Sequence, residues 1–512
     1  MASLAEQPER PPLTRVERTA TAFAVMLATF IQVLDTTIAN VALPHMQTSL
    51  GATPETVNWV LTSYIVALAM AIPITGWLAD RVGRKRLMVS TVIVFTFASV
   101  LCAAAQSLEE MVFFRVVQGI AGAFIVPIAQ AVMFDINPPE RHARAMSLFG
   151  GGIMIGPILG PVLGGWLTEN FSWRWVFLIN LPIGAWATVM LIRFMPKTKQ
   201  VDRRFDLVGF FLLALVMGAF QMMLDRGEQL GWFDSAEIWI EAGVAIGAAW
   251  MFVVHLLTSR EPLFDPKMFR DLNFVLGLLF MAVTGVLLLG GLALLPPLLQ
   301  RLLGYSVLDS GFLTAPRGVG ILCSMLMAGR LVGKIDARLL IFTGMALMAT
   351  SLWQMSGFSL GMDSRPVIVS GIVQGLGLGL IFVPLQTLAF GTLAPKFRTT
   401  AASLLNLSRN LGGSIGISMV TTMLARNLQT SHADLAAQVT PFRIPLADPA
   451  VLDRLGGYGE AGLAALDGEI NRQALMIAFL NDFYLMMMVT LAALPLVLLL
   501  KKARPQPAAG KT

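Results

Sequence analysis

Apolar stretches of about twenty residues recur along the whole 512-residue chain, and they limit its possible folds more than any other feature. A helix rises about 1.5 Å per residue, so each stretch is long enough to cross the hydrocarbon core of a bilayer. Only 13% of the residues are charged and the mean hydropathy is +0.71, which excludes an ordinary soluble domain of this length. The sequence therefore predicts an all-α polytopic membrane protein.

We count fourteen such stretches and predict fourteen transmembrane helices from them. They cover residues 19–42, 56–79, 87–106, 110–134, 145–168, 174–195, 206–224, 237–257, 273–298, 310–332, 339–359, 367–392, 399–425 and 474–500.

The basic residues predict the orientation of these helices. With a cytoplasmic N-terminus, most of the 37 Lys and Arg fall in inner loops and tails, as the positive-inside rule requires. Both termini, 1–18 and 501–512, are therefore predicted to be cytoplasmic tails. The net charge of +6 follows from this bias and does not suggest a nucleic-acid partner.

Four segments of the first half recur in the second half, in the same order and at a nearly constant offset. The pairs are 41–47 with 293–300, 76–87 with 329–340, 117–127 with 373–384, and 145–156 with 401–412. The repeat predicts a six-helix half at 19–195, a two-helix insertion at 196–272 and a second half at 273–500. The second half includes a long outer loop at 426–473. Related halves with a site between them are typical of secondary transporters.

The first predicted helix contains a carboxylate, Asp35. An ionisable side chain at that depth costs at least a few kcal/mol unless it faces protein or water. At about 100° per residue, Gln32, Thr36 and Asn40 lie on the same face as Asp35, so this face is predicted to line a polar cavity. The repeat places the corresponding position near Leu287, where the second half has no carboxylate.

Arg115 and Gln118 lie in the outer half of the fourth predicted helix. The depth of Arg115 is compatible with a pair with Asp35, formed directly or through water. The alternative is that the Arg115 side chain extends to the outer surface, as long basic side chains do. Because Gln118 lies one turn further on the same face, the sequence favours the interior pair.

The second half has charges of its own within the predicted helices: Arg317, Arg409 and Asp482. A direct pair between Arg409 and Asp482 needs tilted helices, so separate roles facing the cavity remain an alternative. Asn406, Arg409 and Asp482 are candidate substrate-cavity residues, together with Gln32, Thr36, Asn40 and Gln118 of the first half.

Residues 76–86, GWLADRVGRKR, join the second and third predicted helices on the cytoplasmic side. A plain positive-inside loop explains the basic residues but not the acid and the two glycines. Glycine supplies a tight-turn conformation that side chains resist, and a carboxylate can hold a nearby guanidinium. We therefore predict a conformational latch, with Asp135 as a candidate partner for Arg81 or Arg84. Its residues are Gly76, Asp80, Arg81, Gly83, Arg84 and Asp135.

The fifth predicted helix is rich in glycine and proline, and its small residues favour close packing of helices. The residues concerned are Gly152, Gly156, Pro157, Gly160 and Gly164.

No lysine follows this stretch, and GRLVGK at 329–334 does not match the nucleotide-loop pattern either, so ATP is not the expected energy source. The two cysteines lie in apolar stretches and predict neither a metal site nor a disulfide. No catalytic pair or ligand cluster occurs in the helices, so an enzyme is not expected.

Taken together, these motifs resemble the major facilitator superfamily. The resemblance rests on LDTTIANVALP at 34–44, the 76–86 loop, RVVQG at 115–119 and the glycine-proline helix. WRWVFLINLPIG at 173–184 and APRGVG at 315–320 narrow it to the fourteen-helix drug:proton antiporters of the EmrB/QacA type. The long loop, with NLQTSHADLAAQV, is similar to the Gram-negative EmrB-like branch.

The resemblance implies the major facilitator fold in a bacterial inner membrane, with no cofactor besides the proton gradient. It implies export of drugs or other hydrophobic or amphipathic small molecules, with a periplasmic adaptor and an outer-membrane channel as partners besides the lipid bilayer. By motif, Asp35 resembles the coupling acid of the family, Arg115 its helix 4 arginine, and Asp80 with Arg84 its loop switch. The chain departs from the pattern at Gly333, which replaces the acid in the second-half loop. A substrate-specific exporter of a siderophore, antibiotic or metabolite is the alternative.

Overall fold

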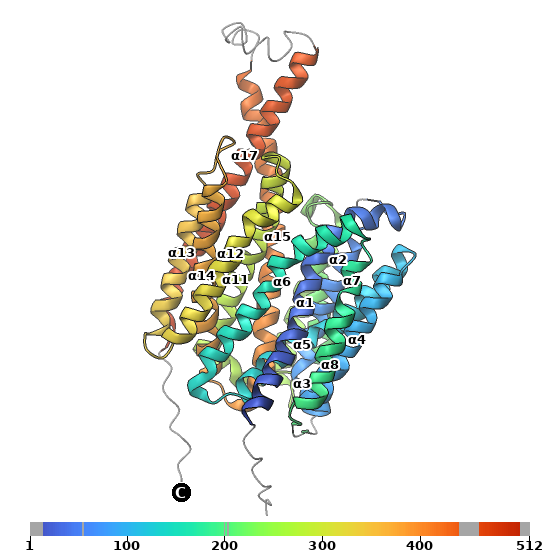
Figure 1. Cartoon of the computed structure of the whole chain (residues 1–512), viewed down its shortest axis with the longest axis vertical. Coiled ribbons are helices and arrows are strands. Elements are labelled where there is room, and N and C mark those ends of the chain that lie inside the picture. Colours follow the sequence, from blue (N-terminus) through green and yellow to red (C-terminus); the bar gives the residue numbers. More distant parts are fainter. Residues whose placement is uncertain (1–13, 54–55, 199, 202–203, 440–459, 502–512) are drawn as a thin grey trace, which may run out of the picture.

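The computed structural model describes residues 14–53, 56–198, 200–201, 204–439 and 460–501, and Figure 1 shows them as a bundle of helices. The helices of the first part are α1 (Arg15–Ser49), α2 (Trp59–Ala71), α3 (Thr75–Val82), α4 (Arg84–Ala104), α5 (Leu108–Asp135), α6 (His142–Asn170), α7 (Trp175–Leu178) and α8 (Asn180–Phe194). Those that follow are α9 (Leu207–Arg226), α10 (Ala236–Thr258), α11 (Leu272–Pro297), α12 (Val307–Leu331), α13 (Ala337–Met355), α14 (Arg365–Gly391), α15 (Arg398–Gln438) and α17 (Glu460–Ala493).

Short helical turns link or extend several of these helices. They are η1 (Ile72–Ile74), η2 (Pro139–Arg141), η3 (Trp232–Asp234), η4 (Pro266–Arg270), η5 (Leu298–Leu302), η6 (Pro395–Phe397) and η8 (Leu494–Leu499). Among them η5 is a π-helical turn that continues α11, and η1 joins α2 to α3 into one span.

Side-chain caps determine where several helices begin. Thr14 and Glu17 form a capping box at the start of α1, in which each side chain satisfies a backbone N–H of the other residue. Asp206 and Asp271 cap α9 and α11 through backbone N–H groups three residues further on. At its other end, α1 extends beyond residue 42, where the predicted first span ends. The helix continues to Ser49 with Pro44 inside it, as neighbouring helices permit in a membrane bundle.

Twelve helices of the described residues are long and apolar enough to cross a membrane, so the chain is a multi-pass membrane protein. The predicted spans at 339–359 and 399–425 are also helical, as α13 and part of α15, but neither is among the twelve. In α15, polar residues such as Asn406 and Arg409 lower the hydropathy. The number of fourteen spans and the cytoplasmic termini therefore remain predictions.

Neighbouring helices divide the bundle into two groups. α1 packs against α6 and α8, and α5 against α2 and α4, whereas α11 packs against α15 and α14 lies between α12 and α13. The groups meet where α6 packs against α12 and α5 against α15. The helices α9 and α10 pack on each other, and α9 also contacts α2 and α15. This arrangement is compatible with the predicted division into two halves and an insertion, which stays a prediction.

The prediction of a long loop at 426–473 is wrong for most of its described residues. Figure 1 shows α15 and α17 continuing beyond the rest of the bundle as a pair of helices, which we call the helical extension. The extension consists of residues 427–438 of α15 and 460–473 of α17. His432 Nε2 lies 3.1 Å from Asp467 Oδ1 across the pair. Residues 440–459 of the predicted loop lie outside the described residues.

The backbones of α11 and α15 approach each other closely at Gly412, which supports a test of packing. An ideal Cβ atom on Gly412 would lie 2.0 Å from the carbonyl oxygen of Ala282, a distance that only a shift of backbone can relieve. We expect Gly412→Ala to destabilise the protein by about 1–3 kcal/mol because the two helices must separate. Gly243→Ala in α10 is the matched control, since no atom lies within 4 Å of that added Cβ. Thermal unfolding of both purified variants checks this, and equal melting temperatures would contradict it.

Candidate functional site

Asp35 and Arg115 form an ion pair in the interior of the first half. Arg115 Nη1 lies 2.5 Å from Asp35 Oδ2, and both side chains are 0% exposed. The Arg115 side chain therefore does not extend to the outer surface. A fully buried ion pair is tolerated only where further hydrogen bonds satisfy its remaining donors and acceptors.

Several polar groups surround this pair. Gln118 Nε2 donates to Asp35 Oδ1 at 3.0 Å, and Asn180 Nδ2 donates to the same oxygen at 3.1 Å. Arg115 Nε donates to the carbonyl oxygen of Val60 at 3.0 Å, and Nη1 also donates to Gln118 Oε1 at 2.8 Å. Helices α1, α2, α5 and α8 thus all contribute to one network around the Asp35 carboxylate.

Aromatic rings complete the surroundings of Arg115. Its guanidinium carbon lies 4.1 Å from the centre of the Tyr64 ring and 5.6 Å from that of Phe177, within the range of cation–π attraction. The Tyr64 hydroxyl accepts a hydrogen bond from Gln32 Nε2 at 3.1 Å. Hydrogen bonds therefore hold the Arg115 guanidinium group, and the aromatic rings stabilise its position further.

Two predicted cavity residues of α1 lie outside this network. Thr36 is half-buried and donates its hydroxyl to the carbonyl oxygen of Val33 at 2.6 Å, within its own helix. Asn40 is exposed. The polar face predicted for α1 therefore divides into a buried part, with Gln32 and Asp35, and a more accessible part nearer the C-terminal end of the helix.

The glycine-rich helix α6 packs on α1, as its small residues predict. Added Cβ atoms would meet Thr37 at Gly160 and Ile38 at Gly164, and similar contacts with α1 occur at Gly152 and Gly156. Pro157 lies inside α6. This close packing holds α6 against the helix that carries Asp35.

The predicted latch is centred on Asp135. Its carboxylate accepts hydrogen bonds from Arg84, at the start of α4, and from Arg398 Nη1 at 2.9 Å, at the start of α15. Arg84 was one of two predicted partners. The other, Arg81, lies with its guanidinium carbon 5.7 Å from the centre of the Trp77 ring. Because Arg398 begins α15, in the other group of packed helices, Asp135 links the two groups.

The rest of the segment 76–86, predicted as a loop, belongs to the end of α3 and the start of α4, which Gly83 separates. Gly83 has a φ of +90° between α3 and α4, where a side chain would be strained. An added Cβ on Gly76 would lie 2.4 Å from Thr400 Oγ1, so α3 packs directly on α15. The backbone carbonyl of Asp80 accepts a hydrogen bond from Val201 N at 2.9 Å.

Further contacts close the same end of the molecule. Asn406 Nδ2 donates to Gln130 Oε1 at 2.7 Å, and the Phe134 and Phe390 ring centres are 4.4 Å apart. Asn406, predicted to line a substrate cavity, therefore joins the halves in this state. Together with the ion pairs of Asp135, these contacts join the two groups of helices near the end of α3 and the starts of α4 and α15.

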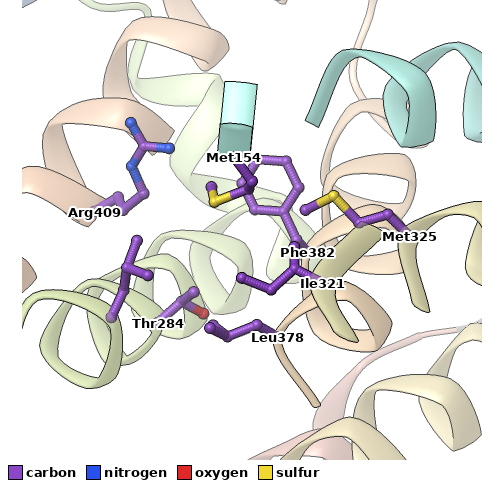
Figure 2. Close-up of a pocket in the computed structure, with 8 residues that line it drawn as sticks. Met154, Thr284, Ile321, Met325, Leu378, Phe382 and Arg409 are labelled. Atoms are coloured by element: carbon purple, nitrogen blue, oxygen red, sulfur yellow. The ribbon is translucent and has the colours of Figure 1, made fainter. Parts of the chain in front are cut away.

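A pocket lies between the halves, deeper in the bundle. Figure 2 shows Arg409 and Thr284 facing it together with apolar side chains. The pocket is small, with a cavity volume of about 10 Å³, and its eight lining residues are Met154, Thr284, Leu288, Ile321, Met325, Leu378, Phe382 and Arg409. Asp482, on α17, is buried but does not line this pocket. No ion pair joins Arg409 to Asp482 in the described part of the chain, so the direct pair considered from the sequence is not present.

Metal ligation has no support in the described ranges. No group of three or more His, Cys, Asp or Glu side chains there is arranged to hold a metal ion.

Sequence reasoning missed three residues of these sites. Asn180 was present in the WRWVFLINLPIG motif, but nothing in the spacing indicated that it faces Asp35. Tyr64 is one aromatic residue within an apolar stretch, where packing is the default interpretation. Arg398 was explained by the positive-inside rule alone, so its pairing with Asp135 required the fold.

The comparisons with known proteins agree with this architecture. The model of the Major Facilitator Superfamily matches residues 25–417. The multidrug export protein EmrB of Escherichia coli K12 is 36% identical over 495 residues, 96% of each chain. The EmrB of Haemophilus influenzae is 37% identical over 84% of this chain and 85% of its own.

A solved structure shows the same fold at low sequence identity. The proton:xylose symporter XylE superposes with a TM-score of 0.59 and 13% identity, covering 92% of this chain and 95% of that one. The motif resemblance, the family model and the full-length relatives therefore agree: the chain belongs to the major facilitator superfamily of membrane transporters and is similar to its EmrB-like multidrug exporters.

Proposed function

We propose that the protein is a proton-coupled antiporter that exports drugs or other hydrophobic or amphipathic small molecules across the bacterial inner membrane by alternating access. One observation carries this proposal: the Asp35–Arg115 pair is completely buried within membrane-spanning helices. Such a pair is costly to build and marks an ion pathway or substrate site by default. The names of the full-length relatives support multidrug export as the function.

The network suggests how a proton drives the cycle. A proton arriving from outside neutralises Asp35, which weakens its hold on Arg115, Gln118 and Asn180. The released donors then favour a different arrangement of α1, α5 and α8, because a buried cation without its carboxylate is destabilised. Moving one charge through 100 mV supplies about 2.3 kcal/mol, so one or two protons can drive a substantial gradient without ATP.

The latch supplies the second element of the mechanism. Asp135 holds Arg84 and Arg398 together, and Gln130 and Asn406 reinforce the contact between the halves. We assign this arrangement to the state whose cytoplasmic side is closed. Opening to the cytoplasm requires these contacts to break, which admits substrate to the space between the halves.

A periplasmic adaptor and an outer-membrane channel are the proposed partners. The helical extension supports this part of the proposal, because it projects from the bundle as paired helices. A substrate-specific exporter of a siderophore, antibiotic or metabolite remains the second candidate, since the fold and the coupling network serve either function equally.

Transport assays in inverted membrane vesicles test the proposal. Imposing an acidic lumen should drive uptake of several chemically unrelated compounds, and a proton-conducting ionophore should stop it. A matched growth-inhibition panel, with and without the gene, distinguishes broad export from a single substrate. Uptake that does not respond to the pH gradient would refute proton coupling.

Asp135→Asn should weaken the latch without removing the coupling network. Both ion pairs of Asp135 are partly exposed, so their loss should change the balance of states by about 0.5–1 kcal/mol, or roughly two- to fivefold. Spin-label distances between the cytoplasmic ends of α6 and α12 should then report more of the open state, with slower export. Asp336→Asn, in the second-half loop and paired with Arg338, is the matched control. An unchanged distance distribution would contradict the latch.

A further inference from the structure

The break between α3 and α4 at Gly83 interrupts the backbone hydrogen bonds of a helix. A continuous helix would pair Arg84 N with the carbonyl oxygen of Asp80. Instead, Arg84 N donates to Thr198 Oγ1 at 2.9 Å. The carbonyl oxygen of Asp80 accepts from Val201 N, also at 2.9 Å. Residues that follow α8 thus supply partners for backbone groups that the break would leave unpaired.

The same segment supplies further partners to the turn. Gln200 Nε2 donates to the carbonyl oxygen of Val82, the last residue of α3, at 2.8 Å. The N-cap position of α4 is a glycine, which has no side chain to accept a hydrogen bond, so the Thr198 hydroxyl caps α4 from outside. Arg84, whose backbone it caps, is the arginine that pairs with Asp135. The Thr198 hydroxyl therefore helps to position the latch arginine.

Further along, this segment contacts both α3 and α9. The Phe205 ring centre lies 4.4 Å from that of Trp77 in α3 and 5.6 Å from that of Phe210 in α9. The next residue, Asp206, caps α9. We call the described residues that make these contacts the linker strap: Thr198, Gln200, Val201, Phe205 and Asp206.

Asp206 joins the linker strap to both inserted helices. Its Oδ1 accepts from Gly209 N in α9 at 2.9 Å, and His255 Nε2, in the last turn of α10, lies 2.8 Å from the same oxygen. Its Oδ2 accepts from Leu263 N, in the segment after α10, at 2.9 Å. The Asp206 side chain is only 7% exposed, so these contacts are largely shielded from water. One carboxylate thus ties the strap to α9, α10 and the chain that follows them.

The inserted helices also contact the two groups of the bundle. α9 packs on α2 in one group and on α15 in the other, and α10 packs on α9. The latch joins the same two groups, through Asp135 and Arg398. A change in the packing of α9 is therefore felt at the latch through the linker strap, which has one end on α9 and the other on the α3–α4 turn.

We propose that α9 and α10 control the latch through the linker strap, which holds the α3–α4 turn where Arg84 reaches Asp135. The inference rests on the proposed export function and gives a role to two helices that its cycle does not use. Thr198 and Asp206 act through Arg84 and α9, so both are positioning residues. Each hydrogen bond contributes modestly, but small changes are enough to shift an element that has two arrangements of similar free energy.

Thr198→Val tests the end of the strap at the latch. Valine keeps the shape of threonine but cannot accept from Arg84 N. Spin-label distances between the ends of α6 and α12 nearest the latch should show the open population rising about two- to fivefold in purified full-length protein. Thr198→Ser retains the hydroxyl and should restore the wild-type distances. Thr188→Val in α8 is the matched control, because the half-buried Thr188 hydroxyl donates within its own helix, to the carbonyl oxygen of Gly184.

Asp206→Asn tests the end of the strap at the inserted helices. Asparagine keeps the size of aspartate but has one acceptor oxygen instead of two and no charge, so it cannot hold α9, His255 and Leu263 together. The open population should rise in the same direction as in Thr198→Val, by about twofold or more. Asp271→Asn is the matched control, because Asp271 caps α11 in the same way, through a backbone N–H three residues further on.

A double variant shows whether the linker strap acts through the latch. Thr198→Val combined with Asp135→Asn should shift the distances no further than Asp135→Asn alone, because the ion pair that the strap positions is already lost. A larger shift in the double variant would overturn the inference, as would wild-type distances in Thr198→Val or Asp206→Asn.

The outcomes also separate this inference from the proposed function, since the distances require neither substrate nor a proton gradient. If both strap variants shift the distances as expected but vesicles transport nothing, the strap is supported and the export proposal fails. If only Asp135→Asn shifts them and vesicles transport, the strap inference fails and the proposed function stands.

Discussion

Asp35→Asn is expected to abolish uphill export in inverted vesicles while leaving membrane insertion intact. Asparagine retains the shape of aspartate and can still accept hydrogen bonds from Gln118 and Asn180, which contact Asp35 Oδ1. It cannot take up and release a proton, so the gradient no longer acts on the network. The pH-driven component of uptake should fall to the level of vesicles without the protein.

Two measurements sharpen this expectation. Wild-type protein should release protons when substrate is added in detergent solution, whereas Asp35→Asn should release none. Asp35→Glu should retain partial activity, because it keeps a titratable carboxylate but displaces it relative to Arg115. Wild-type behaviour of Asp35→Asn in both assays would refute this role, and Asp482, the buried acid of α17, would be the next candidate.

Shortening the helical extension should abolish whole-cell resistance without abolishing transport in vesicles. A short flexible linker in place of residues 429–470 removes the projecting pair of helices but leaves the bundle below it, including the Asp35 network and the pocket. If a periplasmic partner docks on the extension, only the assay that requires passage across the whole envelope should fail.

Asp35→Asn is the informative comparison for the shortened variant, since it should fail in both assays. Loss of vesicle transport in the shortened variant would indicate that the extension is needed for folding. Retained whole-cell resistance would show that no essential partner binds there.

The membrane helices and the charged pair of the first half were predictable because their signals are local. Hydropathy located the spans, and counting residues from the helix ends placed Asp35 and Arg115 at similar depths. A single carboxylate in an apolar helix is also costly enough to require a partner. The internal repeat gave a second and independent indication of two related halves.

Other parts of the sites depend on contacts between distant segments. Asn180 donates to Asp35 from 145 positions further along the chain, and Arg398 reaches Asp135 across 263 positions. Nothing in local spacing encodes such pairings. The helical extension was missed for another reason: its sequence is polar, so hydropathy ended the spans although the helices continue. Contacts such as that between His432 and Asp467 join the two helices of the extension outside the apolar region.

The uninterrupted length of α15 has a mechanical consequence. Its 41 residues contain no proline and correspond to about 60 Å of helix, roughly twice the hydrocarbon thickness of a bilayer. One end carries Arg398, held by Asp135, and the other end lies in the extension, while Gly412 and Gly416 press against α11 midway. A long straight helix of this kind can pivot about its contact with α11, which lies within the membrane. In the proposed cycle, release of the end held by Asp135 would move the opposite tip of α15 the other way, so opening of the latch would displace the helical extension on the other side of the membrane.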